Sequence, residues 1–137
     1  MFLRYVTFID SVRMDCMVRL SEINYAKPWM KDGKPDEKSI KMFLVNTTNP
    51  VHAQIRLSEF CECSGFLLTD AWDYGGNVNI AGPVVINLDN INLLRPYTMR
   101  REISNWVIYF KGGNNCNLHV SANQAKRIQE LLSKPVI

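Results

Sequence analysis

The alternation of apolar and polar residues predicts that most of the chain forms β-strands. Residues 3–9 are rich in Tyr, Val, Thr and Phe, which favour strands. Residues 12–20 place apolar side chains at every second position, as expected for a strand with one covered face. The members of this stripe are Met14, Cys16, Val18 and Leu20. Residues 40–45 are mostly apolar, which is typical of a central strand, and residues 51–57 are predicted to return beside them.

A helical pattern replaces this alternation near the end of the chain. Ser121 with Gln124 three residues later forms a capping-box signature. Ala125, Ile128 and Leu132 follow at helical spacing, so we expect an amphipathic helix of about 13 residues that packs on the sheet. In the first half of the chain, Ser58 is the expected N-cap of a single turn over residues 59–63, which Gly65 ends.

One stretch of the sequence occurs twice. Residues 87–99 repeat residues 19–30 in altered form, at a constant offset of 88 − 20 = 96 − 28 = 68. The matched pairs are Leu20 with Leu88, Ile23 with Ile91, Asn24 with Asn92, Pro28 with Pro96, and Trp29 with Tyr97. Such repeats are sought first because they determine the fold. A chance match between apolar strands that end in proline turns is the alternative interpretation.

The order of features after each copy agrees with a duplication. A polar loop follows, over residues 31–38 or 100–105, because each proline is expected to end its strand. An apolar strand, a turn and a short strand ending in Ser58 or Ser121 come next. Between the copies, residues 66–68 are expected to form a strand and residues 69–77 a loop that carries Trp72 and Tyr74.

These patterns predict an α+β fold. We expect tandem duplicated βββα units that form a mainly antiparallel sheet or barrel-like core with a C-terminal helix. The chain is expected to be a single domain, 1–137, built from two repeats at about 1–66 and 67–137. Edge strands are expected, and their unpaired backbone groups can lead to aggregation. A homodimer that pairs or covers these edges would prevent it.

Composition narrows the functional classes only slightly. The chain has 137 residues, 47% of them hydrophobic, and a net charge of +3, which permits an anionic ligand without requiring nucleic acid. No apolar run reaches the length of a membrane span, and Asp10 interrupts the only candidate for a signal peptide. The four cysteines form no Cys-x-x-Cys pair, so we expect free thiols, a cytoplasmic protein and no metal site.

No catalytic motif is present, so the protein is not expected to be an enzyme or to carry a cofactor. His52 and His119, the only histidines, lie in no nucleophile, metal or general-base setting, and His119 is expected to face solvent or a groove. Asp70 and Asp73 could form a carboxylate pair, but a solvated turn is the favoured interpretation.

Basic and aromatic residues gather after each copy of the repeat and predict a binding site. Arginine matches phosphate bidentately, and aromatic rings offer faces to bases. The candidate ligand-binding residues are Arg19, Asn24, Trp29, Asn92, Arg95, Tyr97, Arg100, Arg101 and Trp106. Two such loops could frame one anionic, base-containing ligand. Alternatively, the aromatic residues are hydrophobic plugs, the basic residues solubilise the protein, and the two asparagines form turns.

Each half resembles a small bacterial and phage β-unit. The resemblance rests on residues 86–91, residues 107–113 with their Gly112-Gly113 turn, and Val120-Ser121 before the final helix. The pattern is similar to FlbD-like proteins and, more loosely, to LytTR-type DNA-binding domains and to the phage anti-defence sponges that sequester signalling nucleotides. The first copy departs from it, because Thr47-Thr48 replace the two glycines. No binding residue is carried over from these families.

Three functions are compatible with the sequence. The first is a non-catalytic binding protein for a small anionic, nucleotide-like ligand, for which the resemblance implies an anti-defence sponge or sensor. The second is a nucleic-acid-binding module, whose affinity would fall steeply with salt. The third is a protein-interaction or structural subunit that uses Trp72, Tyr74 and the sheet edges.

Overall fold

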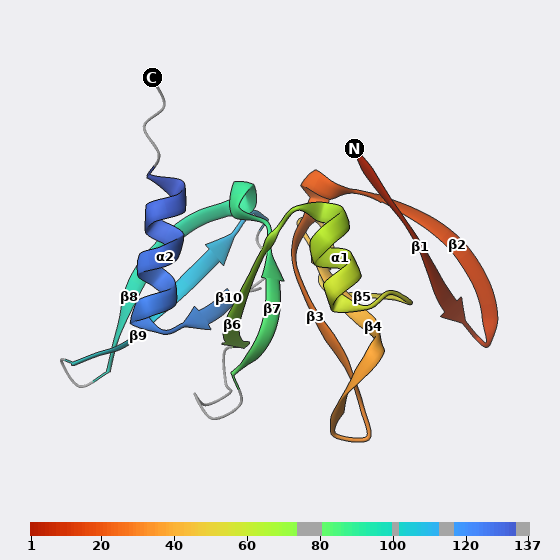
Figure 1. The fold of residues 1–137 in the computed structure, drawn as a ribbon, viewed down its shortest axis with the longest axis horizontal. Helices are drawn as coiled ribbons and strands as arrows, with labels where there is room; N and C mark the ends of the chain where they lie inside the picture. The colour runs from red at the N-terminus through yellow and green to blue at the C-terminus, as the bar shows by residue number, and fades with distance from the viewer. Residues whose placement is uncertain (74–80, 100–101, 113–116, 134–137) are drawn as a thin grey trace.

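The structure is a computed structural model that describes residues 1–73, 81–99, 102–112 and 117–133 of the chain. Within these residues a first half contains β1 (Phe2–Ile9), β2 (Val12–Arg19), β3 (Ile23–Lys31), β4 (Lys34–Leu44), β5 (Val51–Ala53) and α1 (Leu57–Ser64). A second half contains β6 (Leu67–Asp73), β7 (Gly82–Ile86), β8 (Ile91–Met99), β9 (Glu102–Phe110), β10 (Asn117–Val120) and α2 (Ala122–Leu132). Figure 1 shows the two halves side by side.

Eight strands form one sheet in the order β5-β4-β3-β7-β6-β10-β9-β8, and β1 and β2 form a separate hairpin. Every strand pairing among the described residues is antiparallel. The prediction of an α+β fold with a mainly antiparallel sheet and a C-terminal helix is therefore confirmed. The β1–β2 hairpin stands at the far end of the molecule from β8 (Figure 1).

The order of elements in the first half returns in the second. Each half has a strand hairpin, a 3-10 turn (Leu20–Glu22 or Leu88–Asn90), two long strands, a short strand and a helix. The unit therefore has five strands, not the three that the sequence predicted. The offset of 68 between the repeats holds at both ends of β3 and β8, since 91 − 23 = 99 − 31 = 68. Both strands also carry a register shift at their second residue.

The prediction that proline ends the first strand of each repeat is wrong. Pro28 and Pro96 lie within β3 and β8, opposite Ile40 and Trp106. A strand accepts proline where its missing N–H would face an unpaired edge. β8 is the last strand of its sheet, and β3 pairs with β7 at Tyr25 and Ala26 but no further.

The first polar loop is also shorter than predicted. Residues 31–38 belong mostly to the two strands of a hairpin, because β3 ends at Lys31 and β4 begins at Lys34. The turn is made by Asp32 and Gly33, which have φ values of 52° and 77°. The predicted turn residues were therefore right, but the charged residues beside them extend the strands into solvent.

For each helix, part of what the sequence predicted is confirmed. The Ser121 hydroxyl caps α2 by accepting a hydrogen bond from the Gln124 N–H at 3.3 Å, and Gly65 ends α1 at φ 71°. The capping box is not reciprocal, because the Gln124 side chain accepts a hydrogen bond from Thr69 instead. Ser58 is not the N-cap of α1, which begins at Leu57 with Arg56 as its cap. Leu132 was predicted to be buried but is 45% exposed.

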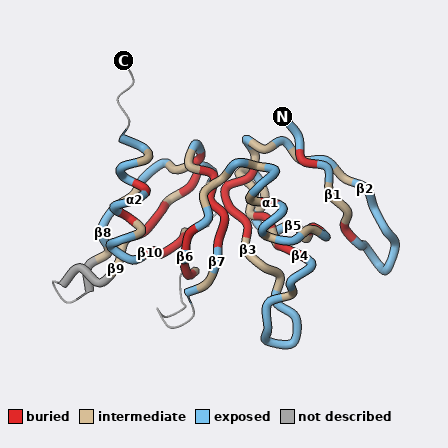
Figure 2. Tube along the Cα trace, viewed as in Figure 1, coloured by how far each residue is buried: buried red, intermediate tan, exposed pale blue. Residues whose placement is uncertain are grey.

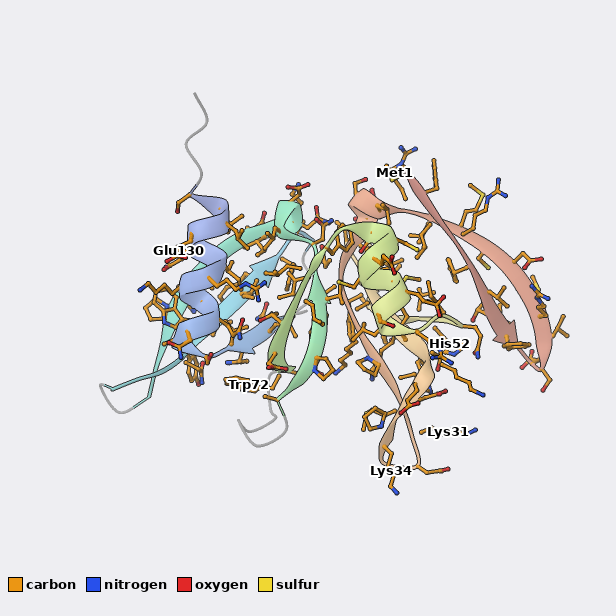
Figure 3. The ribbon with its side chains drawn as sticks, in the orientation of Figure 1. Met1, Lys31, Lys34, His52, Trp72 and Glu130 are labelled. Atoms are coloured by element: carbon orange, nitrogen blue, oxygen red, sulfur yellow. The ribbon has the colours of Figure 1, made fainter. Side chains whose placement is uncertain are left out.

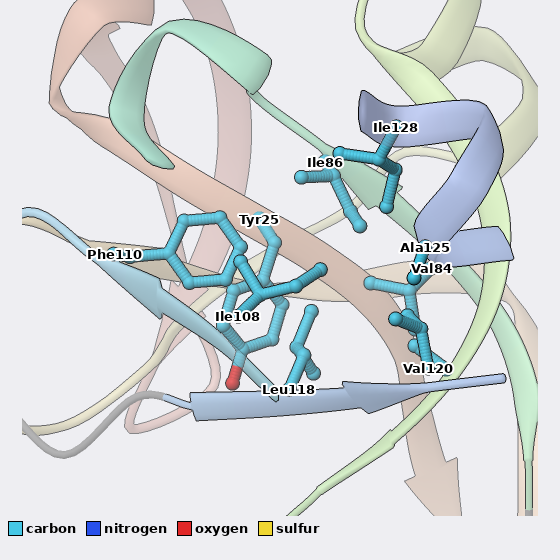
Figure 4. Close-up of a cluster of buried hydrophobic side chains, with 10 residues drawn as sticks. Tyr25, Val84, Ile86, Ile108, Phe110, Leu118, Val120, Ala125 and Ile128 are labelled. Carbon is cyan, nitrogen blue, oxygen red and sulfur yellow. The ribbon is translucent and has the colours of Figure 1, made fainter. Parts of the chain in front are cut away.

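Each half contains one hydrophobic cluster, and each cluster includes a buried residue from the other half. The second-half cluster includes Ile86, Ile108 and Ile128, together with Tyr25 from β3 (Figure 4). The first-half cluster includes Phe60 from α1 and Val85 from β7. Side chains on neighbouring residues of a strand point to opposite faces, so β3 and β7 contribute to both clusters. Figure 2 shows the buried residues concentrated along these central strands.

The segment between the repeats is more ordered than predicted. Residues 69–73 belong to β6 rather than to a loop, and Trp72 is only 8% exposed. Thr69 and Ala71 are buried on the same strand, which gives it the alternating pattern of a half-covered strand. Tyr74 and the rest of the predicted loop, as far as residue 77, lie outside the described residues.

Candidate functional site

A pocket of about 510 Å³ opens where β3 and β7 stop pairing. It is lined by β3, the start of β4, the end of β6 and the start of β7. The lining residues are Lys27, Pro28, Met30, Pro35, Ala71, Trp72, Asp73, Ala81, Gly82, Pro83 and Val84. Figure 3 shows Trp72 at this lower end of the sheet, with the β3–β4 hairpin carrying Lys31 and Lys34 beyond it. The volume lies within the range of small-ligand sites.

The opening coincides with two prolines at the point where the β3–β7 pairing would continue. The Asn87 N–H donates to the Asn24 carbonyl at 2.9 Å, and Ala26 lies opposite Val85. Hydrogen-bonded pairs alternate along an antiparallel ladder. The next such pair would be Pro28 with Pro83, since 28 + 83 = 26 + 85 = 111. Neither residue has an N–H to donate, so the strands separate here and leave the pocket.

An ion pair lies at the polar side of the pocket. The Lys27 ammonium contacts Asp73 Oδ2, and the Lys27 side chain is 20% exposed. Burial, and to a lesser extent the charge of Lys41, lowers the pKa of Lys27 to about 8. The Asp73 carboxylate acts in the opposite direction and favours the ammonium. Lys27 therefore carries its charge at neutral pH.

Asp73 offers a second polar group to the pocket. Its Oδ1 atom is buried and accepts no hydrogen bond from the residues that the structure describes. A buried carboxylate oxygen without a donor is costly. The pocket thus combines one cation and one unsatisfied acceptor with walls of proline, methionine and valine.

His119 packs against Trp72, which lines the pocket. Its ring stacks on Trp72 at 6.0 Å between centroids and meets the edge of Tyr97 at 5.5 Å. The Nδ1 atom donates to Asn105 Oδ1 at 3.0 Å. His119 is 5% exposed, so the prediction that it faces solvent or a groove is wrong.

The two histidines occupy equivalent places in the two halves. His52 on β5 meets the edge of Trp29 with an interplanar angle of 84°, and His119 on β10 meets Tyr97 at the same angle. Trp29 and Tyr97 are themselves a matched pair of the repeat. The aromatic residue after each proline therefore packs on a histidine of its own half.

Acid is expected to weaken the fold through His119. Burial lowers the pKa of His119 below its usual 6.5, so the unfolded chain takes up a proton more readily than the folded protein. Stability should therefore fall as the pH drops below about 6.5. Urea unfolding between pH 7 and pH 5 should show a smaller loss for His119→Gln than for the unaltered chain. An equal loss in both proteins would contradict this expectation.

The predicted site residues of the first repeat do not form one cluster. The Arg19 guanidinium lies 4.6 Å from the Phe2 ring centre at the end of β2. Asn24 is buried in β3 and donates to the Lys111 carbonyl at 3.0 Å, so it joins the two halves and is not a turn residue. Trp29 packs on His52 and carries the Lys41 ammonium 5.9 Å from its ring centre.

The predicted residues of the second repeat lie along β8 and β9. Asn92 is exposed on β8. Arg95 lies over the Tyr109 ring and donates to its hydroxyl at 2.8 Å. Trp106 is half-buried against the second-half cluster, and Tyr97 packs on His119. Arg100 and Arg101 lie outside the described residues.

The two repeats do not bring their basic residues to one place. β7, β6, β10 and β9 lie between β3 and β8 in the sheet. The sequence predicted none of the pocket residues Lys27, Trp72 and Asp73 as ligand-binding residues. That these residues line one pocket becomes apparent only when Pro28 is placed opposite Pro83, which requires the register of the strands.

Comparison with known proteins adds no family to this description. Neither the protein-family models, nor the curated proteins, nor the solved structures gave a match to this chain. Within the described ranges, no three metal-binding side chains come together, and no helix is long and apolar enough to cross a membrane.

Proposed function

We propose that the protein is a non-catalytic binding protein for a small anionic, nucleotide-like ligand, and that the Pro28–Pro83 opening is its binding site. The observation that carries this proposal is the pairing of Lys27 and Asp73 at the polar side of an otherwise apolar pocket. Small-molecule sites typically combine apolar walls with a few polar groups that fix orientation.

The polar groups match two features of such a ligand. The Lys27 ammonium has three donors, of which Asp73 takes one, so it retains donors for an anionic group. Asp73 Oδ1, which accepts no hydrogen bond within the described residues, could accept an N–H of the kind that the edges of most bases provide. The flat walls of Pro28 and Pro83 and the ring of Trp72 suit a planar heterocycle.

The resemblance of each half to small phage and bacterial β-units extends this proposal. A sponge or sensor that sequesters a signalling nucleotide is the form of binding that the resemblance implies. We also infer that the chain arose by duplication of a five-stranded unit, which the shared element order and the offset of 68 support.

Loss of the ion pair should abolish ligand binding. The double variant Lys27→Gln with Asp73→Asn keeps a hydrogen-bonding pair but removes both charges. A panel of mononucleotides and cyclic dinucleotides is titrated by calorimetry at moderate salt. The best ligand of the unaltered protein should bind the double variant at least about 10-fold more weakly, because charge-assisted hydrogen bonds are about twice as strong as neutral ones.

Arg95→Ala is the matched control variant, and it tests the alternative that the basic and aromatic residues of the second repeat form the binding site. Arg95 lies on β8, which four other strands separate from β3, so its loss should leave the affinity unchanged if the pocket is the site. Loss of binding in Arg95→Ala with normal binding in the double variant would move the site to the second repeat. Failure of every ligand to bind the unaltered protein would refute the proposed function.

A further inference from the structure

Two strands at opposite ends of the molecule, β2 and β8, have no strand on their outer side among the described residues (Figure 1). β8 ends the eight-stranded sheet, and β2 pairs with β1 but with no other strand. The Gln54 N–H donates to the Val6 carbonyl at 2.6 Å, so β1 lies beside β5. The first half therefore places its strands in the order β2-β1-β5-β4-β3, with the separate β1–β2 hairpin joined to the end of β5 by this hydrogen bond, and the second half has the order β7-β6-β10-β9-β8.

The contact between the halves joins the last strand of one unit to the first strand of the next. β3 pairs with β7, with Tyr25 opposite Ile86 and Ala26 opposite Val85. All four side chains are at most 2% exposed. This β3–β7 junction is heterologous, because it joins two different edges of the repeated unit.

The offset of the repeats maps this junction onto the two free edges. Adding 68 converts Tyr25 and Ala26 of β3 into Leu93 and Leu94 of β8. Subtracting 68 converts Ile86 and Val85 of β7 into Val18 and Met17 of β2. We propose that β8 of one copy pairs with β2 of a second copy, which places Leu93 opposite Val18 and Leu94 opposite Met17.

The backbone groups on both edges point the right way for this pairing. The Leu20 N–H donates to the Met1 carbonyl, so alternation turns the N–H of Met17 away from β1. β8 carries its register shift at the same place as β3, so Leu94 presents its N–H outward as Ala26 does toward β7.

Each of the two edges exposes an apolar side chain at the proposed contact, although exposed edge strands of monomers usually carry charged side chains there. Met17 is 57% exposed and Leu93 is 49% exposed, whereas their counterparts at the β3–β7 junction, Val85 and Tyr25, are buried. Exposed apolar edge strands are templates for pairing with another chain.

One feature of the β3–β7 junction has no counterpart at the free edges. Asn90 donates from its side chain to the carbonyls of Ser21 and Ile23 across the junction. The matching residue of the first half is Glu22, whose carboxylate cannot donate. Pairing between copies is therefore weaker than pairing within the chain and depends on concentration. A heterologous contact of this kind produces a closed ring or an open chain, not a two-fold dimer.

Sedimentation over a range of protein concentrations tests the assembly. The unaltered protein should form species larger than a dimer as concentration rises. Leu94→Pro blocks the β8 edge and Met17→Pro blocks the β2 edge, and each should sediment as a monomer. If either proline variant fails to fold, Leu93→Lys and Met17→Lys replace them. Leu68→Lys is the matched control, because Leu68 is also 49% exposed but lies on the interior strand β6.

Mixing the two blocked variants separates this pairing from a symmetric dimer. The Met17 variant retains a free β8 edge, and the Leu94 variant retains a free β2 edge. Their mixture should therefore form a 1:1 complex that stops at two chains. A dimer formed by either variant alone would show pairing between like edges and would overturn the proposal. A monomeric unaltered protein at the highest soluble concentration would also overturn it.

A cysteine pair tests the register. Leu93→Cys with Val18→Cys places two thiols at a non-hydrogen-bonded pair, where the Cα atoms of an antiparallel ladder are about 4.5 Å apart. Oxidation should give a ladder of cross-linked chains on a denaturing gel. Leu93→Cys with Met17→Cys shifts the pair by one residue to opposite faces and should not cross-link. Equal cross-linking of both variants would refute the register. These outcomes do not depend on ligand binding.

Discussion

Gly112→Ala is expected to destabilise the protein by about 3–5 kcal/mol. Gly112 has a φ of 89°, which a side chain opposes, and a Cβ atom there would overlap the Val45 carbonyl oxygen and lie 3.0 Å from its carbon. Both obstacles are backbone, so neither can rotate away. Gly112 follows β9 in the second half, and Val45 follows β4 in the first. The substitution should therefore separate the two halves.

Equilibrium unfolding in urea measures this loss. Gly65→Ala is the matched control, because Gly65 also has a positive φ, 71°, but a Cβ atom there would meet nothing within 4 Å. It should cost only the left-handed backbone conformation, about 1–2 kcal/mol. Equal losses for the two variants would show that the contact with Val45 contributes nothing.

Phe60→Ala is expected to cost about 3–5 kcal/mol, the usual range for removing a fully buried phenylalanine. Phe60 is 0% exposed and is the one fully buried side chain that α1 contributes to the first-half cluster. Its ring meets Phe66 edge-on at 5.9 Å. The substitution leaves a cavity between α1 and the sheet, so α1 should lose its attachment first.

Thermal and urea unfolding of Phe60→Ala should be compared with those of Phe8→Ala. Phe8 is 51% exposed on β1, so its truncation removes the same side chain but only about half as much buried area, and it leaves no enclosed cavity. That variant should therefore lose less than about 2 kcal/mol, well below the loss in Phe60→Ala. A loss of more than 2 kcal/mol in Phe8→Ala would mean that β1 is covered in solution.

The sequence predicted local structure well because periodicity is local. The strands over residues 3–9 and 12–20 and the Ser121-capped helix were all recognisable from neighbouring residues. The order of strands was not, because β7 pairs with β3, which precedes it by more than fifty residues. Pro28 was misread for the same reason, since whether a strand tolerates proline depends on which side of it is paired.

The pocket was harder to predict than the fold. Basic and aromatic residues repeat on β3 and β8, but repetition places them at corresponding points of two units and not at one point. Lys27 and Asp73 are 46 residues apart and meet only because β3 and β6 flank β7. The sequence around a single residue such as Asp73 does not indicate which distant residue it will contact.

The two prolines that face each other also decide how the pocket can change over evolutionary time. A cavity maintained by bulky side chains is lost when one of them is altered. Here the strands part because the backbone at Pro28 and Pro83 lacks donors, so the opening does not depend on the size of the residues around it. Met30 and Val84 can therefore be exchanged, and the shape of the pocket altered, while the sheet and the opening persist.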